Sequence, residues 1–123
     1  MPFDSKARLI GLLSATTMAA IVMASLLPPN WIPRTGLGWQ VEHFLAYFTT
    51  TIVLCVAWRR PFVVAVSLIM CSGLLEAVQG LTPDRLPDLT SALCGTLGAV
   101  SAAMLVKLLC LDRRHILFFG ARA

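Results

Sequence analysis

Charged residues are scarce in this chain. Lys, Arg, Asp and Glu together make up 13% of the 123 residues, whereas charged residues make up about 25% of a typical soluble domain. Hydrophobic residues make up 58%, and the mean hydropathy is +0.81. This composition argues against an ordinary soluble domain and indicates a membrane protein. Apolar segments occupy most of the chain, and we expect the short polar segments between them to be too small for a second, soluble catalytic domain.

The chain also lacks the motifs of the common metal and nucleophile sites. Its two histidines and four cysteines do not have the spacing of a zinc or redox motif, and no serine or cysteine stands in a nucleophile elbow. We therefore predict neither a metal nor a cofactor. We interpret the cysteines, which all fall in apolar segments, as small packing residues. They are Cys55, Cys71, Cys94 and Cys110.

Four apolar segments are long enough to cross a bilayer, which takes about 20 residues of helix. They are Leu9–Leu27, Val41–Trp58, Phe62–Gly80 and Leu89–Leu111. The very short link between the second and third segments predicts a helical hairpin. We therefore predict an all-α membrane protein, an antiparallel bundle of four transmembrane helices in a single domain that covers residues 1–123.

The basic residues indicate how this bundle is oriented. If the N-terminus is cytoplasmic, eight of the ten basic residues lie inside, and Arg34 and Arg85 lie outside. This distribution satisfies the positive-inside rule and predicts that both termini are cytoplasmic. A secretory signal peptide is the alternative for the first segment, but its apolar run of about 19 residues exceeds the usual 7–15. We expect no nucleic-acid partner, since a folded basic surface is missing.

Polar residues gather at the outer ends of the second and third segments and in the loop that follows. These residues are Glu42, His43, Tyr47, Glu76, Gln79, Asp84, Arg85 and Asp88. A carboxylate within an apolar span is costly and usually marks a functional site, which makes Glu76 the leading candidate. Because an unpaired carboxylate in hydrocarbon is too costly to persist, we expect Glu76 to contact Arg85, His43 or both.

The order and spacing of these residues resemble the VanZ family. The matching segments are Ser25-Leu26-Leu27-Pro28-Pro29, Glu42-His43-Phe44-Leu45-Ala46-Tyr47, Glu76-xx-Gln79-xxx-Pro83-x-Arg85-xx-Asp88 and Gly95-Thr96-Leu97-Gly98. The resemblance implies a small multi-pass protein of the bacterial inner membrane with a polar site on its outer face. The family is named for a member that confers low-level resistance to the glycopeptide teicoplanin.

The resemblance also implies which residues form the site, and where this chain departs from the pattern. The matching positions are His43, Tyr47, Glu76, Gln79, Arg85 and Asp88. In the family, asparagine is common at the position of Gly95, an acidic residue is frequent at that of Ser91, and glycine is common at that of Asp84. The first two departures reduce the polar set that the fourth segment contributes.

Three functions fit these residues, and we favour the first. In the first, the protein binds a lipid-linked or cell-wall component at the outer face, as part of a response to glycopeptides or envelope stress. The ligand-binding residues are then Arg85, Gln79, Asp88, Tyr47 and Glu42.

In the second, the protein is an integral-membrane enzyme acting on a lipid, with Glu76 and His43 as the catalytic acid and base. Ser72, one turn before Glu76, is the nearest nucleophile, but a serine in a membrane helix usually bonds its own backbone. In the third, the protein is a scaffold. A stripe of small residues, which also suits a homo-oligomer, would pack against a partner. This stripe is Ser91, Gly95, Ala99 and Ala103.

Overall fold

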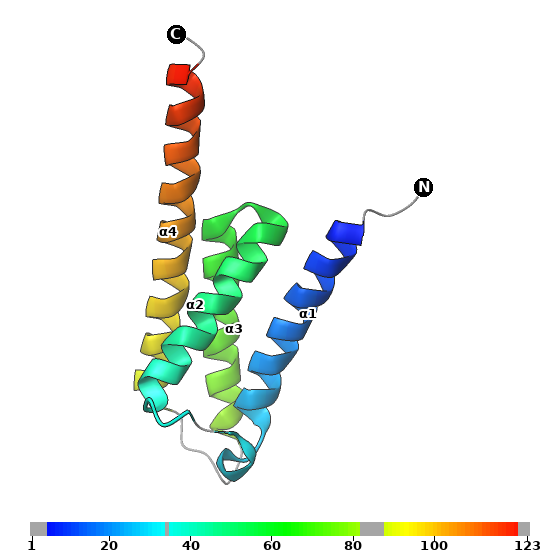
Figure 1. The fold of residues 1–123 in the computed structure, drawn as a ribbon. Coiled ribbons are helices and arrows are strands. Elements are labelled where there is room, and N and C mark those ends of the chain that lie inside the picture. Colours follow the sequence, from blue (N-terminus) through cyan, green and yellow to red (C-terminus); the bar gives the residue numbers. More distant parts are fainter. Residues whose placement is uncertain (1–4, 34, 82–87, 121–123) are drawn as a thin grey trace.

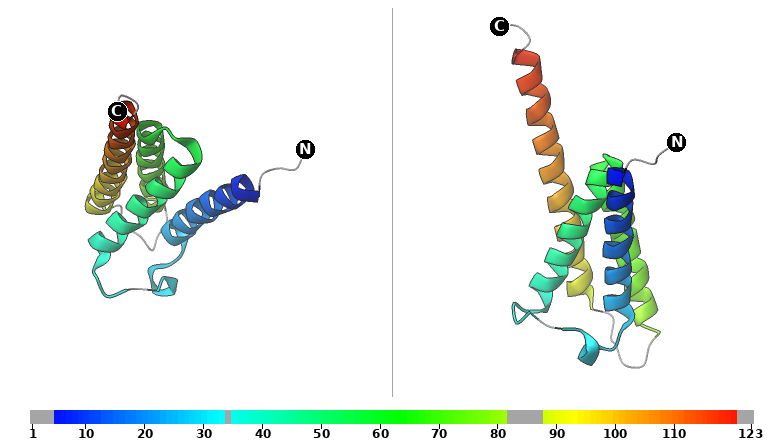
Figure 2. Two further views of the ribbon diagram at one scale, coloured as in Figure 1. Left: turned by 45° about the horizontal axis from the view of Figure 1, so that its top comes forward. Right: turned by 45° about the vertical axis from the view of Figure 1, so that its right-hand side comes forward.

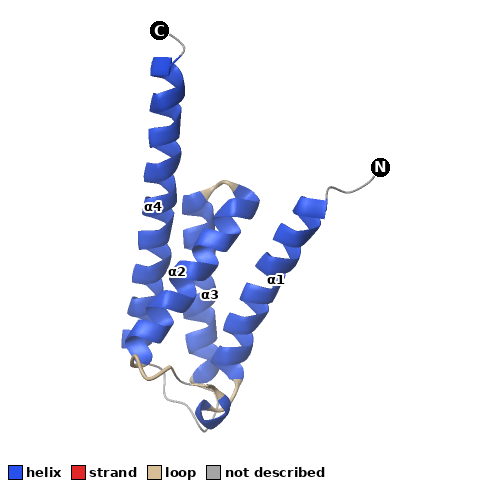
Figure 3. Cartoon of the chain, viewed as in Figure 1, coloured by secondary structure: helices blue, strands red, loops and turns tan. Residues whose placement is uncertain are grey.

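The computed structural model describes residues 5–33, 35–81 and 88–120, which form a four-helix bundle (Figure 1). The elements are α1 (Ser5–Leu26), the short 3-10 helix η1 (Pro29–Trp31), α2 (Trp39–Trp58), α3 (Pro61–Gln79) and α4 (Leu89–Gly120). These described ranges contain no β-strand (Figure 3). The predicted all-α fold is therefore confirmed.

Each of the four α-helices contains a segment long and apolar enough to cross a membrane. These segments are Arg8–Leu26, Trp39–Trp58, Pro61–Gln79 and Leu89–Cys110, and the predicted spans begin and end within two residues of them. The chain is thus a multi-pass membrane protein by length and composition. The helix α4 differs from the prediction because it continues to Gly120 rather than ending near Leu111. Its 32 residues extend about 48 Å, more than the ~30 Å hydrocarbon core.

The start of α1 and the end of α4 lie at the same end of the bundle (Figures 1 and 2). The segment around η1, the start of α2, the end of α3 and the start of α4 lie at the opposite end. We call the first the cytoplasmic end and the second the outer end, following the topology that the basic residues predict. The polar residues singled out in the sequence belong to the outer end.

The predicted hairpin of α2 and α3 is closed by a turn at the cytoplasmic end. Arg59 ends α2 in the left-handed region, at φ 49°, and its N–H donates to the Cys55 carbonyl over 2.9 Å. Pro61 then begins α3, a position where its missing N–H and fixed φ cost nothing. Such a short turn leaves α2 and α3 antiparallel.

The helix α2 packs mainly against α4, α3 also packs on α4, and α1 packs against α2 and α3. The close approach of α2 and α4 depends on glycine. A Cβ atom at Gly95 would lie 3.0 Å from Cδ2 of Tyr47, and one at Gly98 would overlap the Phe44 carbonyl oxygen. Small residues at a helix interface permit this backbone contact.

The small-residue stripe of α4 is used within the chain. Ala99 and Ala103 are fully buried in the core, and Ser91 and Gly95 are buried as well. The prediction that this stripe receives a second copy therefore needs correction, because α2 and the other helices of the same chain already cover it. The core that includes Ala99 and Ala103 is completed by apolar residues from all four helices. They are Ile21, Tyr47, Leu54, Cys55, Val64, Ala65 and Leu68.

Candidate functional site

Three aromatic side chains follow one face of the first two turns of α2. The ring centroids of Trp39 and His43 are 4.6 Å apart, and those of His43 and Tyr47 are 6.1 Å apart. Spacing by four residues places each ring one turn above the last. The row begins at the outer end with Trp39, which is half-buried, and ends at Tyr47, which is buried in the core.

The first of these rings is hydrogen-bonded to α4. Nε1 of Trp39 donates to the hydroxyl of Ser91, and that hydroxyl donates to Oδ2 of Asp88 over 2.9 Å. The chain of bonds ties the start of α2 to the start of α4. It also gives Ser91 a positioning role at the place where the VanZ pattern frequently has an acidic residue.

Asp88 caps α4. Besides accepting the Ser91 hydroxyl, its carboxylate accepts the backbone N–H of Thr90 through Oδ1 over 3.0 Å. The hydrogen bond from Ser91, followed by the bonds from Thr90, lowers the pKa of Asp88 below its ordinary value of 3.8. A negative cap also interacts favourably with the positive end of the helix dipole. The predicted ligand-binding residue Asp88 thus has a structural role in this fold.

Glu76 is half-buried and joins α3 to the start of α4. Its Oε1 accepts the backbone N–H of Asp88. This backbone N–H is a partner that the sequence did not predict. Of the two partners expected for Glu76, Arg85 lies outside the described residues, and contact with His43 stays a prediction.

Two further polar contacts connect the outer halves of the helices. Nε2 of the buried Gln79 donates to the Ser25 carbonyl over 2.6 Å, which joins α3 to α1. The side chain of Ser72 in α3 lies near the Tyr47 hydroxyl of α2. Buried polar groups in a membrane protein need such partners, because the hydrocarbon offers none.

Glu42 holds the loop that precedes α2. Its Oε1 accepts both the backbone N–H and the hydroxyl of Thr35, each over 2.7 Å. The loop itself depends on two glycines in the left-handed half of backbone space, Gly36 at φ 81° and Gly38 at φ 95°, where other residues are strained. Glu42 therefore fixes the loop against the first turn of α2.

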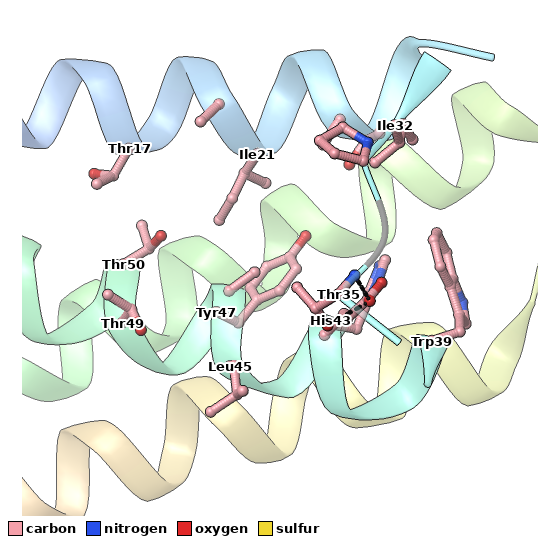
Figure 4. A pocket seen from close by; sticks show the side chains of 16 residues that line it. Thr17, Ile21, Ile32, Thr35, Trp39, His43, Leu45, Tyr47, Thr49 and Thr50 are labelled. Atoms are coloured by element: carbon pink, nitrogen blue, oxygen red, sulfur yellow. Dashed lines mark hydrogen bonds between the residues drawn. The ribbon is translucent and has the colours of Figure 1, made fainter. Parts of the chain in front are cut away.

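A cavity of about 500 Å³ lies between α1 and α2, next to this loop (Figure 4). Most of its exposed wall is made of apolar atoms, and its carboxylate and imidazole groups, Glu42 and His43, lie toward the outer end. In Figure 4, Thr17 and Ile21 of α1 face Tyr47, Thr49 and Thr50 of α2, with Thr35, His43 and Trp39 at the other end. The residues that line the cavity are Thr17, Ala20, Ile21, Ala24, Ser25, Ile32, Pro33, Thr35, Trp39, Glu42, His43, Leu45, Ala46, Tyr47, Thr49 and Thr50.

The structure divides the predicted site residues into two groups. Glu42, His43 and Tyr47 line the cavity. Glu76 and Asp88 form the α3–α4 contact described above, and Gln79 forms the contact with α1. Asp84 and Arg85 lie outside the described residues.

Sequence reasoning missed the roles of Trp39, Thr35 and Ser25 in the site. Trp39, His43 and Tyr47 are spaced four residues apart, and this spacing was a signal that could have placed Trp39 among the site residues. Nothing in the sequence indicated that the Thr35 side chain would meet Glu42, or that the Ser25 carbonyl would meet Gln79, since both are contacts between separate segments.

Within the described residues, no three His, Cys, Asp or Glu side chains come close enough to hold a metal ion. All four cysteines are free. Cys55 is buried, Cys71 and Cys94 are half-buried, and Cys110 is exposed.

Compared with protein-family models, curated proteins and solved structures, the chain matches none of them. The resemblance to the VanZ family therefore depends on the quoted residues alone.

Proposed function

We propose that this chain is a VanZ-like protein of the bacterial inner membrane that binds a lipid-linked component of the cell wall at its outer face. Through this binding it alters the response of the cell to glycopeptide antibiotics and to envelope stress. The observation that carries the proposal is the α1–α2 cavity, of about 500 Å³, with Glu42, His43 and Tyr47 in its wall. This volume lies in the range of about 300–1,000 Å³ typical of ligand pockets.

The lining of the cavity suits an amphiphilic ligand. Apolar atoms make up most of the exposed wall, and His43 and Thr35 lie toward the outer loop (Figure 4), as does Glu42, which is bonded to Thr35. A few placed polar groups in an apolar pocket fix the orientation of a ligand. In our proposal Arg85 adds a planar array of donors, which suits phosphate or carboxylate groups.

The contacts of Glu76 favour binding over catalysis. Its carboxylate oxygen accepts the Asp88 backbone N–H, so it already serves to hold the start of α4. An acid–base role would require the same carboxylate to exchange a proton with a substrate. The alternative of a lipid-acting enzyme that uses Glu76 and His43 is therefore second to binding. A scaffold role through the small residues of α4 is disfavoured because α2 covers them.

The first experiment identifies the ligand. The chain is expressed in a bacterial membrane and purified in mild detergent, and the bound lipids are determined by mass spectrometry. The proposal predicts enrichment of a lipid-linked saccharide or peptide over its share of the membrane. A lipid profile identical to that of the bulk membrane would count against the proposal.

The second experiment measures the cellular effect. Susceptibility to a lipoglycopeptide and protein abundance are measured for the wild type, Arg85→Ala, Glu76→Gln and the control Arg60→Ala, whose exposed arginine lies at the cytoplasmic turn. We expect Arg85→Ala to abolish the effect on susceptibility at unchanged abundance, and Glu76→Gln to preserve it. If wild-type expression does not alter susceptibility, the antibiotic role is wrong. Loss of abundance in parallel with the effect would indicate a purely structural role.

A further inference from the structure

The α1–α2 cavity is accessible from the side of the bundle. Several of its lining residues are exposed although they lie within the membrane-spanning parts of α1 and α2. They are Ala20, Ala24, Leu45, Ala46 and Thr49. Since the surface at this depth faces hydrocarbon, the cavity communicates with the bilayer as well as with the outer loop.

The length of the cavity corresponds to one leaflet. Its lining on α2 runs from Trp39 to Thr50, a rise of about 16 Å at 1.5 Å per residue. Half of the ~30 Å hydrocarbon core is about 15 Å. A lipid of the outer leaflet with its headgroup at the Trp39 end of the cavity, where the Glu42 carboxylate meets Thr35, would therefore end its chain near the floor of the cavity, between Thr17 and Thr50.

The deep part of the cavity is lined by the hydroxyls of Thr17, Thr49 and Thr50 and by no charged side chain. The hydroxyl of Thr17 donates to carbonyls of its own helix, those of Leu13 and Ser14, over 3.0 Å each. The neighbouring lining residues Ala20 and Ile21 are apolar. The carboxylate of Glu42 and the imidazole of His43 thus lie toward the outer end, where a lipid has its headgroup, while the deep end carries only hydroxyl and apolar groups.

From this match we propose that the cavity seats the hydrocarbon chain of the ligand, which enters sideways from the outer leaflet between α1 and α2. This inference rests on the proposed function, because the occupant is the lipid-linked saccharide ligand rather than bulk phospholipid. Lipid tails are as apolar as the cavity wall, so moving a chain into it gains little from hydrophobicity. The hydrocarbon chain therefore sets the position of the ligand, and contacts at the headgroup determine which ligand the protein selects.

The test uses the full chain in bilayer discs of phosphatidylethanolamine and phosphatidylglycerol. One probe is a long-chain alkyl disaccharide with a photoreactive diazirine near the end of the chain, and the other is phosphatidylglycerol with the same group. Labelled residues are mapped by mass spectrometry. We expect the glycolipid probe to label the region around Thr17 and Thr50, and an excess of unlabelled glycolipid to remove this labelling.

Matched substitutions on α1 test whether the labelling depends on the cavity. Ala19 and Ala20 are neighbours and both exposed, but only Ala20 lines the cavity. Ala20→Phe should reduce the labelling severalfold by filling the cavity, whereas Ala19→Phe should leave it unchanged. Ala46→Phe fills the cavity from α2 and should act like Ala20→Phe, which guards against a folding defect peculiar to one variant.

The remaining outcomes separate this inference from the proposed function. If the glycolipid is retained but labels other surfaces, and Ala20→Phe does not change the labelling, the ligand binds outside the cavity. Only this inference is then overturned. Equal labelling of the cavity by phosphatidylglycerol would show that it holds bulk lipid, which also overturns the inference. If the glycolipid is not retained at all, the proposed function fails as well.

Discussion

The carboxylate of Glu76, near the end of α3, accepts the backbone N–H of Asp88 at the start of α4. A single side chain thus fixes where the next helix begins. The same region is tied to α2, because the Trp39 indole reaches the hydroxyl of Ser91. Three helices are thereby held together at the outer end, beside a cavity that lies between α1 and α2.

The Glu76 contact predicts a difference between two substitutions. Glu76→Gln keeps a carbonyl oxygen that can accept the Asp88 N–H, so we expect stability and ligand retention close to wild type. Glu76→Leu leaves that donor without its acceptor and should lower the free energy of unfolding by about 1–3 kcal/mol. Thermal unfolding in detergent measures the stability of both variants, and lipid mass spectrometry measures their ligand retention. If Glu76→Gln folds like the wild type but loses an activity that the wild type has toward a lipid, the result would instead support the alternative of a lipid-acting enzyme.

The contact of α2 and α4 predicts that any side chain at Gly98 destabilises the bundle. A Cβ atom there would overlap the Phe44 carbonyl oxygen and lie 3.1 Å from the Phe48 nitrogen. Backbone cannot yield as a flexible side chain can, so Gly98→Ala should destabilise the bundle by about 1–3 kcal/mol. Gly73→Ala is the control, because nothing lies within 4 Å of a Cβ atom at Gly73. We expect this control to be neutral or stabilising by ~0.5–1 kcal/mol. Equal effects of the two changes in thermal unfolding would contradict the close approach.

The bond from Gln79 to the Ser25 carbonyl predicts that this glutamine holds α1 against α3. Hydrogen bonds between membrane helices contribute about 0.6 kcal/mol on average and at most about 1.7. Gln79→Leu should therefore lower stability by that amount and increase the mobility of a spin label at Ala19. Gln40→Leu makes the same change at an exposed position of α2 and should do neither. An unchanged spin-label spectrum in Gln79→Leu would show that this bond does not restrain α1.

The cap of α4 predicts a specific dependence on pH. The pKa of Asp88 is lowered in the folded protein by the hydroxyl of Ser91 and the N–H of Thr90. A lowered pKa means that the ionised cap stabilises the fold above the ordinary value of 3.8, and that this contribution is lost as the pH falls from there through the folded-state pKa. Asp88→Asn still caps the helix but cannot ionise. Its melting temperature should fall less steeply than that of the wild type below about pH 4. If the melting temperatures of the two proteins fall equally steeply at acid pH, the role of the ionised cap is refuted.

The orientation of the bundle is testable independently of any ligand. The eight-to-two split of basic residues predicts that both termini are cytoplasmic. A reporter that is active only in the cytoplasm should work when fused after Ala123 and fail when inserted between Leu81 and Asp88. The reverse pattern would place the cavity end of the bundle inside the cell and remove the basis for a cell-wall ligand.

The sequence by itself determined the number and type of the helices and the bounds of their apolar spans. Apolar runs of about 20 residues leave few alternatives in a membrane, because every backbone group must be satisfied within its own helix. The hairpin at Arg59 and Pro61 followed from a link too short for any other path. The convergence of polar residues at one end also followed, since it depends only on alternating helix direction.

Only the tertiary structure decided which of these polar residues meet. The sequence places Glu76 near the outer loop, but its contact with the Asp88 N–H depends on how that loop returns the chain to α4. The stripe of Ser91 and Gly95 was equally compatible with a second copy and with α2, because small residues favour any close helix partner. The cavity depends on the separation of α1 from α2, a property of the packed bundle. The periodicity of the sequence shows which side chains share a face of each helix, whereas the side-chain volumes of all four helices decide which faces come into contact.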